Sequence, residues 1–193
     1  MGKLVVTQFI SVDGVIEDPG GSEDFEYGGW SFEYDRGEDG DQFKMDELNA
    51  AEAALLGRVT YEGFAAAWPE REGDEEEGGF AEKFNSMPKH VVSTTLKDPE
   101  WNNSHVISDN VPEEVEKLKG QYDGEIQVAG SATLVKTLAE NGLVDQWNLM
   151  VFPTVLGKGK RLFPDGIPRL KLKLAEDRGV GPDGVRVQIY ERA

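Results

Sequence analysis

The sequence predicts an α/β domain with a central, mostly parallel sheet that gains antiparallel strands at its carboxyl end. Two observations carry this prediction. In the middle of the chain, short apolar runs alternate with segments whose apolar residues recur at helical spacing, an order typical of parallel strands joined by helices. Toward the carboxyl end, strand-like segments follow one another directly, which favours antiparallel pairing.

Length and composition predict a single domain over residues 1–193. Hydrophobic residues make up 38% of the chain, and no apolar run approaches the roughly 20 residues of a membrane helix. The amino terminus enters a strand-like run without the pattern of a signal peptide, so we expect a cytoplasmic protein with no membrane partner. The chain has no cysteine, which excludes disulfides, thiolate metal sites and cysteine nucleophiles.

The formal net charge of −17, from 37 acidic and 20 basic residues, argues against nucleic acid as a partner, because nucleic-acid binding needs a basic face. An acid excess of this size is typical of a highly soluble protein. An anionic ligand must then be attracted by a few local cations and backbone N–H groups. This draws attention to Arg58, Lys160 and Arg161.

The first predicted element is a central strand at residues 3–10, where valine and isoleucine dominate. Residues 18–40 are rich in glycine and acid but carry several aromatic side chains, so they form a covering flap or pack on the domain surface. Apolar residues at helical spacing predict a helix at residues 41–51, with Asp41 as its cap.

Glycine and proline divide the middle of the chain. Residues 53–56 read as a buried strand, a helix at residues 61–68 ends before Pro69, and the charged residues 70–79 predict a surface loop. The elements predicted next are a helix at residues 80–87, strands at 90–93 and 104–107, and a helix at 112–119.

The carboxyl half begins with a strand at residues 126–129 and a helix at residues 131–140 that Asn141 and Gly142 end. The last predicted strands are residues 146–155, 171–175 and 185–191, with a glycine-rich turn at 179–184. The length of the strand at 146–155, together with the family resemblance described below, makes a homodimer a reasonable expectation.

Two glycine turns follow buried strands, one at Gly57 and one at Gly130. Each leads into a predicted helix, so free backbone N–H groups and the positive end of a helix dipole face outward there, which suits a phosphate. Two such turns predict one pyrophosphate held from two sides. The alternative is that both glycines only permit tight turns.

Six short segments occur in an order that is found in a known family. They are residues 11–14 (SVDG), 56–62 (LGRVTYE), 93–94 (ST), 128–131 (VAGS), 143–145 (LVD) and 155–164 (VLGKGKRLFP). Their order resembles that of dihydrofolate reductases, and more closely that of the reductase (C-terminal) domain of the riboflavin-biosynthesis deaminase-reductase. The resemblance covers nearly the full chain and implies a dihydrofolate reductase-like, three-layer α/β/α fold that binds NADPH across the carboxyl ends of the central strands.

The resemblance also assigns the cofactor residues. Those at the phosphates would be Gly57, Arg58, Val59 and Thr60 at the first turn and Gly130, Ser131, Ala132 and Thr133 at the second. Arg58 would bind the adenosine 2′-phosphate together with Ser93 and Thr94, since a guanidinium can bind a phosphate bidentately while hydroxyls donate beside it. The family often has two glycines at the second turn, where this chain has Gly130 and Ser131.

For the substrate, the resemblance points to Asp41 as a carboxylate that binds and protonates a heterocycle, the alternative being a helix cap. Asp13 is placed to orient the substrate, or else to form a turn with Gly14. Glu47 is expected to face solvent.

A substrate phosphate has candidate partners in Lys158, Lys160 and Arg161, although a basic strand edge is an equal interpretation. No metal site is expected, because His90 and His105 lie in predicted strands without an acid-flanked helix.

The function implied by the resemblance is an NADPH-dependent reductase that transfers hydride to a pterin, a ribosylaminopyrimidine or a related small heterocycle. The alternative is an NADP(H)-binding protein of the same fold that has lost turnover and acts as a sensor or partner subunit.

Overall fold

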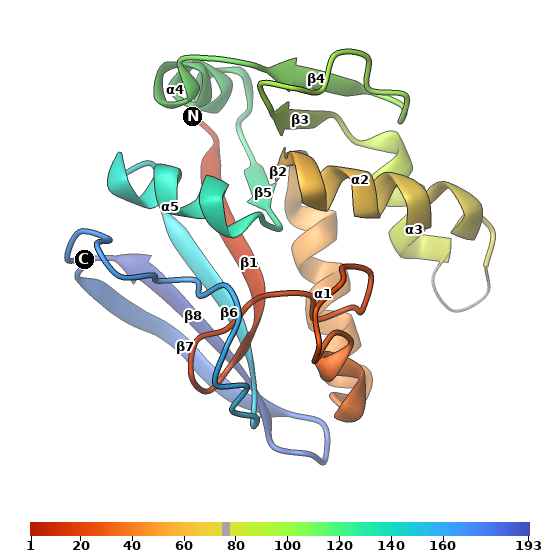
Figure 1. Ribbon diagram of the computed structural model, residues 1–193, viewed down its shortest axis with the longest axis vertical. Coiled ribbons are helices and arrows are strands. Elements are labelled where there is room, and N and C mark those ends of the chain that lie inside the picture. Colours follow the sequence, from red (N-terminus) through yellow and green to blue (C-terminus); the bar gives the residue numbers. More distant parts are fainter. Residues whose placement is uncertain (75–77) are drawn as a thin grey trace.

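The computed structural model describes residues 1–74 and 78–193, and the strands of this part form one eight-stranded sheet (Figure 1). The strand order is β4-β3-β2-β5-β1-β6-β8-β7. The strands are β1 (Lys3–Ser11), β2 (Ala51–Gly57), β3 (Lys89–Val92), β4 (Ser104–Ile107), β5 (Glu125–Val128), β6 (Gln146–Phe152), β7 (Leu172–Val180) and β8 (Val185–Arg192). Only the pairs β6–β8 and β7–β8 are antiparallel, so the predicted mixed sheet is confirmed.

Helices cover both faces of this sheet. They are α1 (Gly37–Ala50), α2 (Arg58–Ala67), α3 (Gly78–Ser86), α4 (Val111–Gln121) and α5 (Ala132–Glu140), with short 3-10 helices at Trp30–Glu33 and Pro69–Arg71. Apolar residues of α4 and α5 share one core cluster with Leu4 and Val6 of β1, whereas α1, α2 and α3 pack with Leu56 of β2 in another. The α/β/α layering predicted above is therefore present.

β1 extends beyond the carboxyl end of β5, and this positions the site. β1 pairs with β5 only from Lys3 to Val6, but with β6 from Val5 to Ser11. The chain leaves β5 through α5 toward β6, and it leaves β1 through α1 toward β2, on the other side of β5. Open α/β sheets bind ligands at such a switch point, outside the carboxyl ends of the strands.

Several element boundaries differ from the prediction. α1 begins at Gly37, so Asp41 lies inside the helix and is not its cap. β6 ends at Phe152, because the next residue, Pro153, lacks the N–H that a strand ladder needs. β7 continues to Val180, which shortens the predicted turn to residues 181–184. Residues 75–77 of the predicted charged loop lie outside the described part of the chain.

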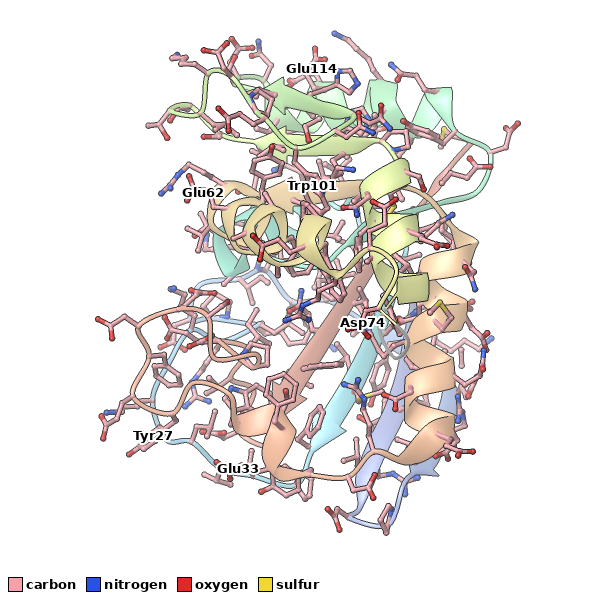
Figure 2. The ribbon with its side chains drawn as sticks, turned by 90° about the vertical axis from the view of Figure 1, so that its right-hand side faces the viewer. Tyr27, Glu33, Glu62, Asp74, Trp101 and Glu114 are labelled. Atoms are coloured by element: carbon pink, nitrogen blue, oxygen red, sulfur yellow. The ribbon has the colours of Figure 1, made fainter. Side chains whose placement is uncertain are left out.

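The aromatic residues before α1 mostly pack onto the domain. Trp30 is 1% exposed and meets Phe152 of β6 edge to face, with ring centroids 5.5 Å apart. Its indole N–H donates to the Glu17 carbonyl oxygen at 2.8 Å. Figure 2 shows Tyr27 and Glu33 of this segment at the end of the molecule opposite Glu114 of α4. Of the two interpretations of residues 18–40, packing on the surface is therefore the correct one.

The strand used to argue for a homodimer, β6, lies inside the sheet between β1 and β8. Its backbone is paired on both sides, so it offers no edge to a second copy, and the sheet edges are β4 and β7. No described helix has both the length and the apolar character that crossing a membrane requires.

A half-buried histidine on β3, His90, predicts that the stability of the protein depends on pH. Burial, together with the neighbouring His105, lowers the pKa of His90 from 6.5 to about 4. Between these values the unfolded state binds more protons than the folded state, so stability falls as the pH falls through this window. We expect His90→Gln to reduce the loss of unfolding free energy between about pH 7 and about pH 4.5, measured by urea denaturation.

His105→Gln serves as the control, because His105 is exposed. It should keep most of the loss that the wild-type protein shows. An equal loss in the wild-type protein and in His90→Gln would contradict this assignment.

Candidate active site

The two glycine turns contact each other at the carboxyl ends of β2 and β5. The Gly57 N–H donates to the Gly130 carbonyl oxygen at 3.1 Å. A Cβ on Gly57 would lie 2.4 Å from the Ser131 hydroxyl oxygen, and a Cβ on Gly130 would lie 2.9 Å from the Thr60 hydroxyl oxygen. Gly130 also has a φ of 125°, which side chains rarely allow. Both positions therefore require glycine for the turns to approach.

The two helices that start at these turns have open amino termini. Gly57 precedes α2 and Ser131 precedes α5, and neither helix has a side-chain hydrogen bond at its cap. The first turns of α1 and α4 carry acidic residues, whereas those of α2 and α5 carry none. In this acidic chain, the two turns thus keep the free N–H groups and positive potential that favour an anion.

Arg58 is the cation nearest to this pair of turns in sequence. Its side chain is 43% exposed and forms an ion pair with Glu62 at 2.7 Å, one helical turn later. Exposed pairs of this kind contribute little to stability, so Arg58 can exchange Glu62 for a phosphate at small cost.

Gly57 pairs with Val92 in the register of β2 and β3, so Arg58 and Ser93 leave neighbouring strands side by side. The Ser93 side chain is buried, and its oxygen accepts the N–H groups of Thr95 and Leu96, at 3.2 and 3.0 Å. Thr94 is exposed. Ser93 therefore closes the loop, and its exposed neighbour is the one free to meet a ligand.

The other predicted cofactor residues line the same two helix starts. Val59 is 41% exposed and Thr60 half-buried in the first turn of α2. Ala132 and Thr133 occupy the first turn of α5. The residues predicted for the pyrophosphate therefore belong to the two turns that the hydrogen bond between Gly57 and Gly130 joins, and to the helix starts that follow them.

Asp13 anchors a loop in the structure. Its carboxylate accepts the Ser11 hydroxyl at 2.7 Å and the N–H groups of Leu156 and Gly157 at 3.1 and 2.9 Å. Burial alone would raise the pKa of Asp13, but these hydrogen bonds hold it below its usual value. Asp13 is therefore an ionised acceptor that joins the end of β1 to the loop after β6.

The three basic residues after β6 face carboxylates. Lys160 pairs with Glu17 at 2.7 Å, and this hydrogen bond raises the pKa of Lys160. Arg161 donates to the Asp13 carbonyl oxygen, and Lys158 pairs with Glu26. Instead of gathering into an open anion site, these cations join two loops.

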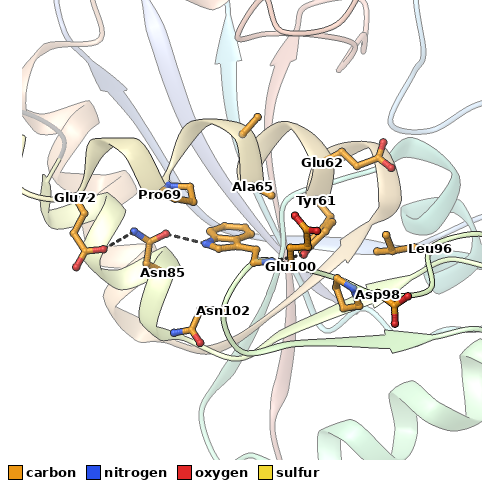
Figure 3. Close-up of a pocket in the computed structure, with 13 residues that line it drawn as sticks. Tyr61, Glu62, Ala65, Pro69, Glu72, Asn85, Leu96, Asp98, Glu100 and Asn102 are labelled. Atoms are coloured by element: carbon orange, nitrogen blue, oxygen red, sulfur yellow. Dashed lines mark hydrogen bonds between the residues drawn. The ribbon is translucent and has the colours of Figure 1, made fainter.

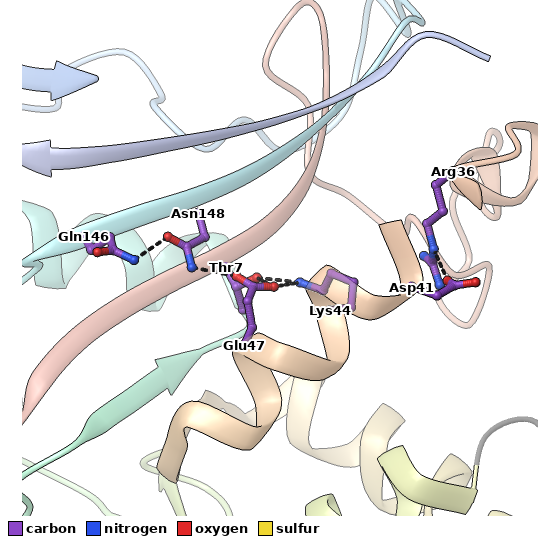
Figure 4. Close-up of polar contacts among 7 residues, drawn as sticks. All are labelled: Thr7, Arg36, Asp41, Lys44, Glu47, Gln146 and Asn148. Carbon is purple, nitrogen blue, oxygen red and sulfur yellow. Dashed lines mark hydrogen bonds and ion pairs between the residues drawn. The ribbon is translucent and has the colours of Figure 1, made fainter. Parts of the chain in front are cut away.

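The predicted substrate carboxylate, Asp41, is exposed. Its side chain is 58% exposed and pairs with Arg36 at 2.6 Å (Figure 4). The expectation for Glu47 is wrong, because its side chain is 5% exposed. With α1 starting at Gly37, the buried residues Gly40, Phe43 and Glu47 share one helical face. The predicted helix at residues 41–51 already placed Phe43 and Glu47 four residues apart on one face, which was the signal available in the sequence.

Glu47 is the centre of a buried polar network between α1 and the sheet (Figure 4). Its carboxylate accepts the Thr7 hydroxyl of β1 at 3.0 Å, the Asn148 amide of β6 at 2.7 Å, and the Lys44 ammonium. Asn148 in turn accepts the Gln146 amide at 2.7 Å. This network fixes α1 over β1 and β6 through a paired, ionised carboxylate.

Phe9 of β1 lies beside this network with two cations over its ring. The Arg36 guanidinium and the Lys44 ammonium are each 5.2 Å from the ring centroid. Sequence patterning did not indicate this cluster, because its members come from β1 and two positions around α1.

A pocket of about 660 Å³ lies beside α2, between this helix, α3 and residues 96–102 (Figure 3). Asn85 crosses it, donating to Glu72 at 3.0 Å and accepting the Trp101 indole N–H at 2.8 Å. Its wall carries the carboxylates of Glu62, Glu72, Asp98 and Glu100. This charge repels phosphate, so the pocket is unsuited to an anionic cofactor.

Comparison with known proteins adds sequence relatives. The family model described as the RibD C-terminal domain matches residues 2–185. The uncharacterized protein YyaP of Bacillus subtilis (strain 168) is 32% identical over 176 residues, which cover 91% of this chain and 88% of YyaP.

Solved structures share the fold. A putative riboflavin biosynthesis protein from Shewanella sp. PV-4 superposes with a TM-score of 0.76 at 18% identity, over 99% of each chain. Dihydrofolate reductase from Enterococcus faecalis, complexed with NADP(H), gives 0.57 at 15% identity, over 99% of this chain and 96% of that one. The predicted dihydrofolate reductase-like fold is therefore confirmed.

The close approach of the Gly57 and Gly130 turns predicts that a methyl group added at Gly57 destabilises the protein. Gly57→Ala would place its Cβ 3.0 Å from the Ser131 backbone nitrogen as well as against its side chain, so the turns must move apart. We expect a loss of about 2 kcal/mol in the free energy of unfolding, measured by urea denaturation.

Gly63→Ala, in the helix α2 that follows Gly57, is the matched control, because its Cβ would meet only the Ser22 hydroxyl oxygen among the described residues, at 3.7 Å. It should stabilise the protein by about 0.5 kcal/mol. Similar values for the two variants would show that the turns do not constrain position 57.

The network around Glu47 predicts a second effect on stability. Glu47→Ala leaves the largely buried Lys44 ammonium without its carboxylate. We expect a loss of about 3 kcal/mol in the free energy of unfolding. Asp46→Ala is the control, since Asp46 bonds only Gln42 on the exposed face, and it should change stability by less than about 0.5 kcal/mol. A loss below about 1 kcal/mol for Glu47→Ala would contradict the buried network.

Proposed function

The chain belongs to the RibD C-terminal domain family, and from this premise we propose that it is a reductase that uses NADPH to reduce a small heterocycle. One observation carries the proposal: the hydrogen bond that joins the Gly57 and Gly130 turns. It brings two uncapped helix starts together, and their backbone N–H groups suit the two phosphates of a dinucleotide.

The residues fit this cofactor at both phosphate positions. A Cβ at Gly57 would meet Ser131 and one at Gly130 would meet Thr60, so glycine at both positions lets the two turns approach. In this proposal the backbone N–H groups of α2 and α5 bind the pyrophosphate. Arg58, beside the exposed Thr94, binds the 2′-phosphate after leaving Glu62. When bound, the cofactor supplies a hydride, while the protein positions it against the substrate.

The substrate class proposed is a pterin or a ribosylaminopyrimidine such as 5-amino-6-(5-phosphoribosylamino)uracil. Family membership supports it, as does the fold shared with a dihydrofolate reductase. On the protein side, the Phe9 ring offers an apolar contact for an aromatic substrate near the end of β1. The Arg36 and Lys44 cations beside the ring pair with Asp41 and Glu47.

A second candidate is an NADP(H)-binding protein without turnover. Asp41 is exposed and paired with Arg36, and Glu47 is bound to Lys44, so neither of these two carboxylates is a free buried acid. Reduction of a heterocycle requires a proton as well as a hydride, and a buried acid is a common proton donor. This observation therefore favours the second candidate.

The test is NADPH oxidation in the presence of dihydrofolate or of the ribosylaminopyrimidine, followed by absorbance. Oxidation that depends on one of these compounds supports the reductase. Tight NADPH binding with no turnover on either compound favours the second candidate, and absence of NADPH binding overturns both.

The position proposed for Arg58 predicts that the protein prefers NADPH to NADH. Arg58→Ala should weaken NADPH binding by about 10- to 100-fold, because a charge-assisted bond to the 2′-phosphate is lost, and should leave NADH binding nearly unchanged. Dissociation constants for both dinucleotides, measured by fluorescence titration, check this. Arg178→Ala is the control, since Arg178 pairs with Glu176 on β7. If Arg58→Ala lowered the affinities for NADPH and NADH by the same factor, Arg58 would not bind the 2′-phosphate.

A further inference from the structure

Gln8, in the middle of β1, has a buried side chain with an unused hydrogen-bonding group. The residue is 7% exposed, and its amide nitrogen has no hydrogen-bonding partner among the described residues. The adjacent Thr7 and the nearby Asn148, by contrast, are both bonded to Glu47. A buried donor without a partner destabilises the folded state, so this amide calls for an explanation beyond packing.

The register of the sheet places Gln8 at the switch point. Strand alternation puts it on the same face as Val6 and Ile10, which belong to the cluster that includes Leu134 of α5. Val6 is the last residue of β1 that pairs with β5, opposite Val128. Two residues further along each strand, Gln8 is level with Gly130, where the chain turns away into α5.

The order of the strands indicates which part of a dinucleotide reaches Gln8. Ser93 follows β3, Gly57 follows β2 and Gly130 follows β5, and β1 is the next strand along the same edge. If the 2′-phosphate lies at Arg58 and the pyrophosphate between the turns, the remaining half of the molecule extends toward β1. That half ends in the nicotinamide ring with its carboxamide group.

We infer that the side-chain amide of Gln8 hydrogen-bonds the carboxamide of the nicotinamide; the inference rests on the proposed function. Each group has one carbonyl acceptor and one N–H₂ donor, so the two are complementary. The Gln8 amide nitrogen has no bond in the free protein that must break first. Gln8 is thus a residue that positions the reactive end of the cofactor beside β1.

The test compares two ligands in wild-type protein and in Gln8→Leu, which keeps similar volume without the amide. NADP⁺ carries the nicotinamide, and 2′-phospho-ADP-ribose has the rest of the molecule without it. Titration calorimetry should show NADP⁺ affinity about tenfold weaker in Gln8→Leu, with the affinity for 2′-phospho-ADP-ribose unchanged. Thermal unfolding without ligand should show Gln8→Leu at least as stable as wild type, because no bond is lost.

Gln188→Leu is the control, since Gln188 lies on β8 and bonds Tyr190. It should leave both affinities unchanged. The inference is overturned if Gln8→Leu binds both ligands more weakly by the same factor, or if neither affinity changes. In either case, binding of both ligands by the wild-type protein still supports the cofactor site. Wild-type protein that binds neither ligand overturns the proposed function and the inference with it.

Discussion

The hydrogen bond between Gly57 and Gly130 is the constraint on which the rest of the candidate site depends. It forms because β2 and β5 are neighbours in the sheet, although α2, α3 and α4 separate them in the chain. The approach is possible only without a Cβ at either position. In consequence α2 and α5, from opposite layers, start beside each other with free N–H groups. An acidic protein thus acquires a local anion site from its backbone.

Side-chain charges are mostly used elsewhere in the molecule. The cations after β6 pair with carboxylates of the segment after β1, which closes the loops at the end of that strand. Glu47 and Lys44 fix α1 over β1 and β6. Arg58 stands at the start of α2, and its ion pair with the exposed Glu62 contributes little to stability. In the proposed function, phosphate recognition therefore depends on backbone N–H groups and on the Arg58 guanidinium.

The sequence predicted the elements and turns well, since these depend on local patterns. The strand at Ser104–Ile107 was predicted at its observed bounds, and each glycine turn follows its strand as expected. The start of α1 was missed because residues 37–40 resemble a glycine-rich loop. The burial of Glu47 was missed because a carboxylate is buried only when it is paired, and its partners Thr7 and Asn148 lie on strands far away in the chain. The partners of Asp13 and Lys160 could not be predicted, because they join segments far apart in the chain. Gln8 carried no local signal, since an alternating strand pattern does not show whether a buried amide finds a partner.

The most direct test of the central claim is a crystal structure of the protein soaked with NADPH. Our account predicts the pyrophosphate within hydrogen-bonding distance of backbone N–H groups from both turns, with Gly57 still bonded to Gly130. A dinucleotide bound at another place, such as the acidic pocket beside α2, would contradict it, as would a pyrophosphate that meets neither turn.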